Sequence, residues 1–189
     1  NNGDEITYFE ILTAGFFHGT KKYKDNINII ESGLFHRFDA TNILEENIAS
    51  VVTAIGIDHT DWLPENERTI DKIIFEKTSS LLNSKIIVSN QDNKKTLEKI
   101  KNSIKSNNSK KIIFNELYSF SLGENDFFYY EDEYGGLKLP MPNLIGEFQL
   151  SNVATAIATL RNIEKINISD DHIKEGILKI PSIARLQEI

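Results

Sequence analysis

Segments with helical periodicity alternate along this sequence with short apolar runs that have the length of strands. Such alternation constrains the fold, because helices that connect successive strands place them parallel in one sheet and cover its faces. The predicted helices span residues 6–22, 67–82, 94–105 and 147–162, with a last one opened by Ser169, and the predicted strands span residues 27–31, 50–55, 85–88 and 111–114. We therefore predict an α/β fold with a mainly parallel sheet flanked by helices.

Residues 118–139 depart from this alternation. They form short alternating aromatic and polar runs that are interrupted by Gly123, Asn125, Gly135 and Gly136. This texture is typical of hairpins, so we expect a small antiparallel β excursion from the parallel sheet. A length of 189 residues with 40% hydrophobic content suits one well-packed domain.

Composition narrows the classes of function. The net charge of −7 argues against a nucleic-acid partner, because phosphate contacts need clustered Lys or Arg. The sequence has no cysteine, which removes disulfides, thiolate metal sites and a cysteine nucleophile. No stretch has the length of a membrane span or the character of a secretory signal, so by elimination we expect a cytoplasmic protein with no membrane partner.

Two polar residues follow strand-like runs and are candidate metal ligands. Glu31 ends the run at 27–31, and His59 follows the run at 50–55. The carboxyl ends of adjacent parallel strands share one crevice, where a metal bound by a carboxylate and an imidazole would serve a nucleotide phosphate. The alternative is that Glu31 caps a helix or is solvated, and that His59 is a surface group.

Lys77 lies on the apolar stripe of the predicted 67–82 helix, where an aliphatic residue is expected. Its ammonium group would have to snorkel to water or lose part of its solvation. A desolvated lysine is more neutral and therefore more nucleophilic. Periodicity alone favours snorkelling.

Five segments in this order resemble the folylpolyglutamate synthase and dihydrofolate synthase family, which is part of the wider Mur-ligase group. The resemblance starts at Thr7-Tyr8-Phe9-Glu10, and its segments are residues 30–42, residues 56–60, Glu76-Lys77, residues 146–152 and Ala184-Arg185-Leu186-Gln187. It implies the central ATPase-type domain of a Mur ligase. It also implies an ATP-dependent, amide-forming ligase of folate biosynthesis and one-carbon metabolism, which adds L-glutamate to dihydropteroate or folates through an acyl phosphate.

The same resemblance implies roles for single residues. Glu31 and His59 would bind Mg²⁺, and Lys77 would be catalytic as a carbamate that binds a second Mg²⁺. The pterin substrate would contact Thr7, Phe9, Arg37, Asp39 and Ala40, and ATP would contact Asn152 and Arg185.

Three of these assignments have plainer alternatives. Residues 39–42 could form a turn with side-chain caps, Asn152 could be a helix N-cap, and Arg185 could be a solvated linker charge. The sequence also departs from the family pattern, since Phe35 and His36 replace two glycines.

The sequence contains no G-x-x-x-x-G-K-[ST] phosphate loop. The resemblance places such a loop before residue 6 and a second domain after residue 187. We therefore expect residues 1–180 to be a central ATP-binding domain without its phosphate-loop segment, and residues 181–189 to begin the linker to a C-terminal domain. The 189 residues alone are expected to be inactive, with the missing parts lost by truncation or gene decay, or carried by a separate chain. The alternatives are a non-catalytic remnant of that enzyme and a Mur-type ligase acting on a cell-wall precursor.

Overall fold

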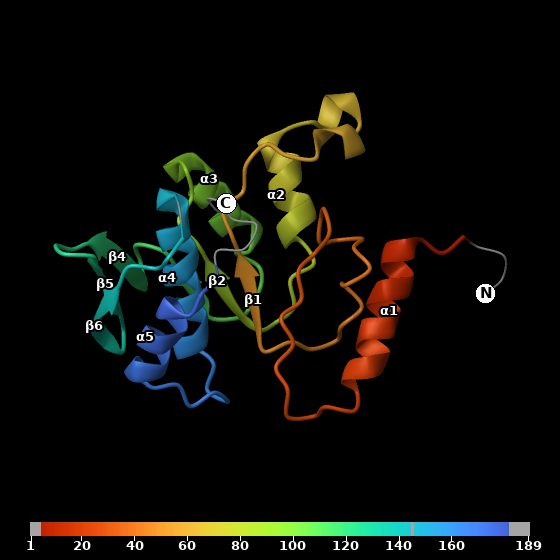
Figure 1. Cartoon of the computed structure of the whole chain (residues 1–189). Coiled ribbons are helices and arrows are strands. Elements are labelled where there is room, and N and C mark those ends of the chain that lie inside the picture. Colours follow the sequence, from red (N-terminus) through yellow and green to blue (C-terminus); the bar gives the residue numbers. More distant parts are fainter. Residues whose placement is uncertain (1–4, 145, 182–189) are drawn as a thin grey trace, which may run out of the picture.

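The computed structural model describes residues 5–144 and 146–181. Its centre is a parallel sheet in the order β1-β2-β3, formed by Ala49–Val52, Lys85–Val88 and Lys111–Ile113 (Figure 1). Helix α2 (Ile70–Thr78) connects β1 to β2, and helix α3 (Lys94–Ser103) connects β2 to β3. The predicted parallel sheet with flanking helices is confirmed.

The strands of this sheet point alternate side chains into two cores. Ile86 and Val88 of β2 and Ile113 of β3 pack in a cluster with α2 and α3. Ile87 and Ile112 face the other way, into a cluster with α4 (Glu147–Arg161) and α5 (Asp170–Leu178). Strands β2 and β3 are buried on both faces, which explains their continuous apolar runs, whereas Val51 of β1 is exposed.

The predicted antiparallel excursion is also confirmed. It consists of β4 (Tyr118–Leu122), β5 (Phe127–Asp132) and β6 (Gly135–Pro140) in the order β4-β5-β6. In β5, Phe128 and Tyr130 are buried, whereas Tyr129 between them is exposed. The buried face joins the core that contains α4 and α5.

Helix α1 (Tyr8–Thr20) begins with a capping box in which Thr7 and Glu10 satisfy each other's backbone N–H groups. Figure 1 shows α1 set apart from the sheet, and Thr13 is its one buried residue within the described part of the chain. Its apolar residues Ile11 and Leu12 are 56% and 52% exposed. Local capping rather than tertiary packing therefore defines this helix.

The predicted strand at 27–31 is wrong, because these residues form no strand. A strand is stabilised by hydrogen bonds to a neighbour, and within the described residues β1 pairs with β2 alone. Ile29 is 95% exposed, so this apolar run does not enter a core. The helix predicted at 67–82 is shorter, since Thr69 caps its start and Ser79 its end.

Two short 3-10 turns, η1 (Thr60–Trp62) and η2 (Glu65–Glu67), lie between β1 and α2. None of the helices in the described ranges combines the length and the apolar character that a membrane span requires.

Candidate functional site

The candidate site begins where the chain leaves β1, at the carboxyl end of the parallel sheet. Gln91, three residues after β2, fixes the backbone of residues 53–55. Its Oε1 accepts a hydrogen bond from the Ile55 N–H at 2.9 Å, and its Nε2 donates to the Thr53 carbonyl at 3.3 Å. Gln91 is buried, so these bonds are protected from water. The segment at 56–60 therefore starts from a fixed point.

His59 occupies the left-handed backbone region, with φ 55°, at the start of η1. Its N–H donates to Asp58 Oδ1 at 2.7 Å, and its Nε2 lies 3.1 Å from Asp58 Oδ2. Its ring meets the Phe35 ring edge to face, with 6.3 Å between the centroids. Asp58 thus orients the imidazole and adds a carboxylate to the site.

Lys77 lies near the end of α2 and turns toward the loop that follows Glu31. Its Nζ donates to the Leu34 carbonyl at 2.9 Å and lies 5.7 Å from the centroid of the Phe35 ring. Burial lowers the pKa of Lys77, and the nearby Asp58 carboxylate opposes that shift. Lys77 and His59 therefore approach the same side chain, Phe35, from two elements.

Glu31 is exposed and lies in the irregular segment that precedes this loop. Among the described residues, no group of three or more His, Asp or Glu side chains is gathered around a metal position. Mg²⁺ commonly uses only one or two protein carboxylates and completes its shell with water and phosphate oxygens. The structure pairs Asp58 with His59 and places His59 and Lys77 at the same Phe35 ring, and no contact links Glu31 to them within the described ranges.

Asp39 organises the loop at residues 33–42. One of its carboxylate oxygens accepts from the Gly33 N–H at 2.8 Å, and the other accepts from the N–H and hydroxyl of Thr41 at 2.9 and 2.6 Å. Asn42 closes the turn by donating from Nδ2 to the Arg37 carbonyl at 3.1 Å. The segment therefore forms a turn with side-chain caps, and half-buried Ala40 lies within it.

Arg37 and Glu76 join this loop to α2. The Nε and Nη2 atoms of Arg37 donate to the two carboxylate oxygens of Glu76 at 2.8 and 2.7 Å. The N–H groups of His36 and Arg37 both donate to the Glu76 carbonyl, at 3.1 and 3.0 Å. That carbonyl belongs to the last turn of the helix and lacks an intrahelical partner, so the loop also caps α2.

Phe9 of α1 meets the same loop from the other side. A Cβ atom placed on Gly33 would lie 3.4 Å from the Phe9 ring and 3.1 Å from Asp39 Oδ2. Phe9 and Asp39, both expected at the pterin, therefore lie side by side around Gly33. Thr7 is further engaged in its capping box, where its hydroxyl donates to Glu10 Oε2 at 2.7 Å.

Asn152 is an exposed residue of α4, and its Nδ2 lies 3.2 Å from Gln149 Oε1. The N-cap of α4 is Gly146, so Asn152 is not the N-cap that its position near the helix start suggested. Arg185, the other residue expected at ATP, lies outside the described residues.

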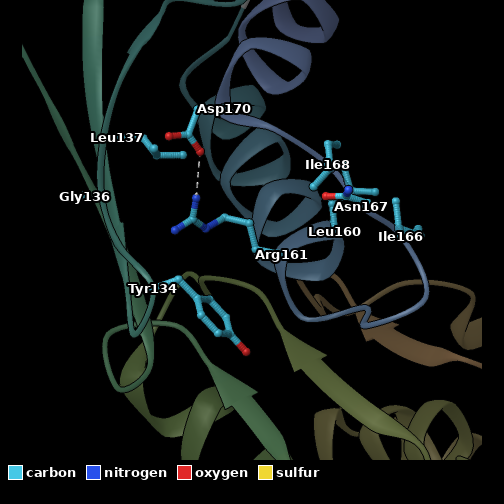
Figure 2. Close-up of a pocket in the computed structure, with 9 residues that line it drawn as sticks. All are labelled: Tyr134, Gly136, Leu137, Leu160, Arg161, Ile166, Asn167, Ile168 and Asp170. Carbon is cyan, nitrogen blue, oxygen red and sulfur yellow. Dashed lines mark hydrogen bonds and ion pairs between the residues drawn. The ribbon is translucent and has the colours of Figure 1, made fainter.

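A cavity of about 370 Å³ lies elsewhere, between β6, the end of α4 and the start of α5 (Figure 2). Arg161 crosses it and pairs with Asp132 and Asp170, at 2.8 and 3.2 Å. Of the expected site residues that the structure describes, none lines this cavity. Its arginine is already neutralised by two carboxylates.

Asp58, Phe35 and Gln91 are residues of the site that sequence reasoning missed. Asp58 had a signal in its position next to His59. Gln91 had a weaker signal, since it is one of several polar residues that follow an apolar strand. Phe35 had none, because its contacts come from other elements.

Comparison with known proteins gives a consistent picture, although no family model matches the chain. The dihydrofolate synthase/folylpolyglutamate synthase of Escherichia coli is 31% identical over 174 residues, which cover 91% of this chain and 38% of that protein. The Bacillus subtilis protein of the same name is 31% identical over 193 aligned residues, covering 96% of this chain and 43% of that protein. The chain therefore spans less than half the length of these relatives.

Comparison of the fold with solved structures identifies the same family. The structure of E. coli FolC in complex with DHPP and ADP superposes with a TM-score of 0.81 at 31% identity, covering 99% of this chain and 43% of that one. Sequence and fold thus agree over nearly the whole chain, and the chain belongs to the dihydrofolate synthase/folylpolyglutamate synthase family.

Proposed function

We propose that the protein carrying this chain is an ATP- and Mg²⁺-dependent ligase that joins L-glutamate to dihydropteroate or to a folate. The observation that carries this proposal is the similarity to the E. coli dihydrofolate synthase/folylpolyglutamate synthase over 91% of the chain. The convergence of Asp58, His59 and Lys77 at the carboxyl end of the sheet supports it, because ligands of open α/β sheets bind there.

The reaction is amide formation through an activated carboxylate. ATP phosphorylates a carboxylate of the pterin substrate, the amine of L-glutamate attacks the acyl phosphate, and phosphate leaves. Catalysis of this kind depends on positioning and on neutralisation of the phosphates, which is the chemistry that Mg²⁺ supplies when bound.

Mg²⁺ prefers carboxylate oxygens as ligands, and Asp58 provides such a group beside His59. We assign Glu31 and His59 to one ion, and a carbamate of Lys77 to a second. Asp58 holds the imidazole of His59 at 3.1 Å, and the partial burial of Lys77 favours the neutral amine that carbon dioxide requires.

The substrate contacts follow from the loop at 33–42 and its neighbours. Phe9 and Asp39, which meet at Gly33, would form the pterin side of the site together with Thr7 and Ala40, and Arg37 belongs to the same loop. Asn152, exposed on α4, would bind ATP together with Arg185.

We further propose that residues 1–180 form the central ATP-binding domain and that residues 181–189 begin a linker to another domain. The proposal is supported by the relatives, of which the chain covers 38% and 43%. A phosphate-binding loop and the remaining catalytic groups would come from outside these 189 residues, either on the same polypeptide or on a separate chain.

The test is glutamate addition followed by mass spectrometry. The protein carrying this chain is incubated with ATP, Mg²⁺, L-glutamate and either dihydropteroate or tetrahydrofolate, and each component is omitted in turn. We expect a product heavier by one glutamyl residue that requires every component, and we expect no product from the 189-residue polypeptide alone. No product from the whole protein with either pterin would refute the proposal.

A further inference from the structure

We propose that Glu76 and Arg37 are positioning residues, whose ion pair latches the 33–42 loop onto the end of α2 and so sets the distance between Asp39 and Lys77. The latch assigns Arg37 an indirect role in place of direct contact with the pterin. The part that concerns the pterin rests on the proposed function, whereas the latch itself does not.

The first argument is that the guanidinium group of Arg37 is already engaged. Two of its nitrogens donate to Glu76 in the bidentate geometry that arginine forms best with a carboxylate. Two aromatic rings also lie close to it, with Cζ 4.1 Å from the Phe38 centroid and 5.2 Å from the Phe75 centroid. A substrate carboxylate would have to displace these contacts.

The second argument is that Glu76 is a buried charge that depends on this partner. Its side chain is 6% exposed, against 32% for Arg37. Lys72 is a second cation at 3.3 Å, but it also pairs with Glu67 at 2.6 Å. Removing Arg37 would leave a buried carboxylate with one shared cation, which is costly.

The third argument is that the latch acts on both sides of the site. Glu76 is followed by Lys77, whose Nζ is held by the Leu34 carbonyl at 2.9 Å. Arg37 is two residues from Asp39, whose carboxylate holds Gly33 and Thr41. If the ion pair opens, the hydrogen bonds that still join the loop to α2 in the described structure are the main-chain bonds to Glu76 and the bond from Lys77.

Amide hydrogen exchange on the 189-residue chain tests the latch without any activity. The Gly33 and Thr41 N–H groups report on the loop, and the Ile86 N–H, which donates to the Lys110 carbonyl at 2.9 Å, reports on the sheet. In Glu76→Gln and in Arg37→Met we expect the loop amides to exchange about tenfold faster or more, with Ile86 unchanged. The double variant should match the single variants rather than add to them.

Asp71→Asn is the matched control, because Asp71 lies on the same helix and forms an exposed ion pair with Lys99 at 2.6 Å. It should leave the loop amides unchanged. Arg37→Lys keeps the charge but loses the bidentate geometry, so it should fall between the native protein and Arg37→Met. Unchanged loop exchange, equal acceleration at Ile86, or additive effects in the double variant would overturn the latch.

Kinetics of glutamate addition by the protein carrying this chain test the positioning role. We expect Glu76→Gln to raise the KM for the pterin about tenfold with the KM for ATP unchanged, although the Glu76 side chain is itself buried. An unchanged pterin KM would overturn the positioning role while leaving the proposed function intact. A protein without ligase activity whose loop amides respond as expected would refute the function and retain the latch.

Discussion

At the residue scale, the last turn of α2 carries two adjacent side chains of opposite charge that turn to different partners. Lys77 is tolerated in its half-buried position because the Leu34 carbonyl and the Phe35 ring replace part of its water. Glu76 is tolerated because Arg37 satisfies both of its oxygens. One short helical segment therefore both fixes the loop and presents the lysine.

The pH dependence of the free energy of unfolding should reveal the contribution of the Glu76 carboxylate. The hydrogen bond from Arg37 lowers the pKa of Glu76 below its ordinary value of 4.5, so the folded protein holds this proton less tightly than the unfolded chain does. Its stabilising contribution is therefore complete above pH 4.5 and is lost as the pH falls through the lower folded pKa. Urea unfolding of native protein and Glu76→Gln should give free energies of unfolding that differ by about 2 kcal/mol at neutral pH and converge in acid. A difference that stays constant with pH would contradict the assignment.

The sequence predicted some residues of the site and could not predict others. Lys77 was identifiable because a charge on an apolar stripe is conspicuous without any structure. The sequence also offers the capped turn at 39–42, since Asp and Asn at such spacing favour local hydrogen bonds. The partnership of Arg37 with Glu76 spans 39 residues, and no local pattern encodes a contact of that range.

At the element scale, the start of α4 depends on one glycine. Gly146, the N-cap, has φ 112° and ψ 135°, a backbone conformation that residues with a Cβ atom rarely adopt. The backbone of this residue sets the direction of α4. That helix carries Asn152 and contributes Leu150, Val153 and Ala154 to the core. The direction of the helix is therefore tied to a backbone conformation that only glycine adopts easily.

Substitution of this glycine should be costly. We expect Gly146→Ala to lower the free energy of unfolding by about 2 kcal/mol, because of the strained backbone. Gly176→Ala in α5 is the matched control: its Cβ would meet nothing within 4 Å, so it should be neutral or stabilising by up to about 1 kcal/mol. Equal effects of the two substitutions in urea unfolding would count against the strain argument.

The one element that was wrongly predicted shows what periodicity lacks. Residues 27–31 have the composition of a buried strand, but a strand also needs a neighbour with which to form hydrogen bonds. The runs that became β1, β2 and β3 have such neighbours in the described structure. Composition therefore predicts the capacity for a strand, and the pairing decides whether it forms.

At the scale of the whole molecule, Tyr118 ties the antiparallel sheet to the rest of the fold. Its hydroxyl donates to the Val88 carbonyl at 3.0 Å and lies 3.2 Å from Thr155 Oγ1 of α4. It therefore joins β4, β2 and α4 in one buried network. The mixed architecture depends on such contacts between the two sheets.

Alkaline unfolding should report on this network. Burial raises the pKa of Tyr118 from 10.0 to about 12, so its contribution is present below pH 10 and is lost as the pH rises toward the folded value. We expect Tyr118→Phe to lower the free energy of unfolding by about 1 kcal/mol at neutral pH. As the pH rises, the free energy of unfolding of this variant should fall less than that of the native protein. Tyr129→Phe, at an exposed position of the neighbouring strand β5, should behave like the native protein. Identical alkaline profiles for native protein and Tyr118→Phe would contradict this role.

The central claim, that the site around Lys77 serves glutamate addition, is tested most directly by pterin-dependent phosphate release from ATP. The protein carrying this chain is assayed with Mg²⁺, ATP, L-glutamate and dihydropteroate or tetrahydrofolate, beside Lys77→Met and the exposed-pair control Lys99→Met. We predict that release requires the pterin, falls about a hundredfold or more in Lys77→Met, and is unchanged in Lys99→Met. Phosphate release that does not require the pterin, or that is as fast in Lys77→Met as in the native protein, would contradict the account.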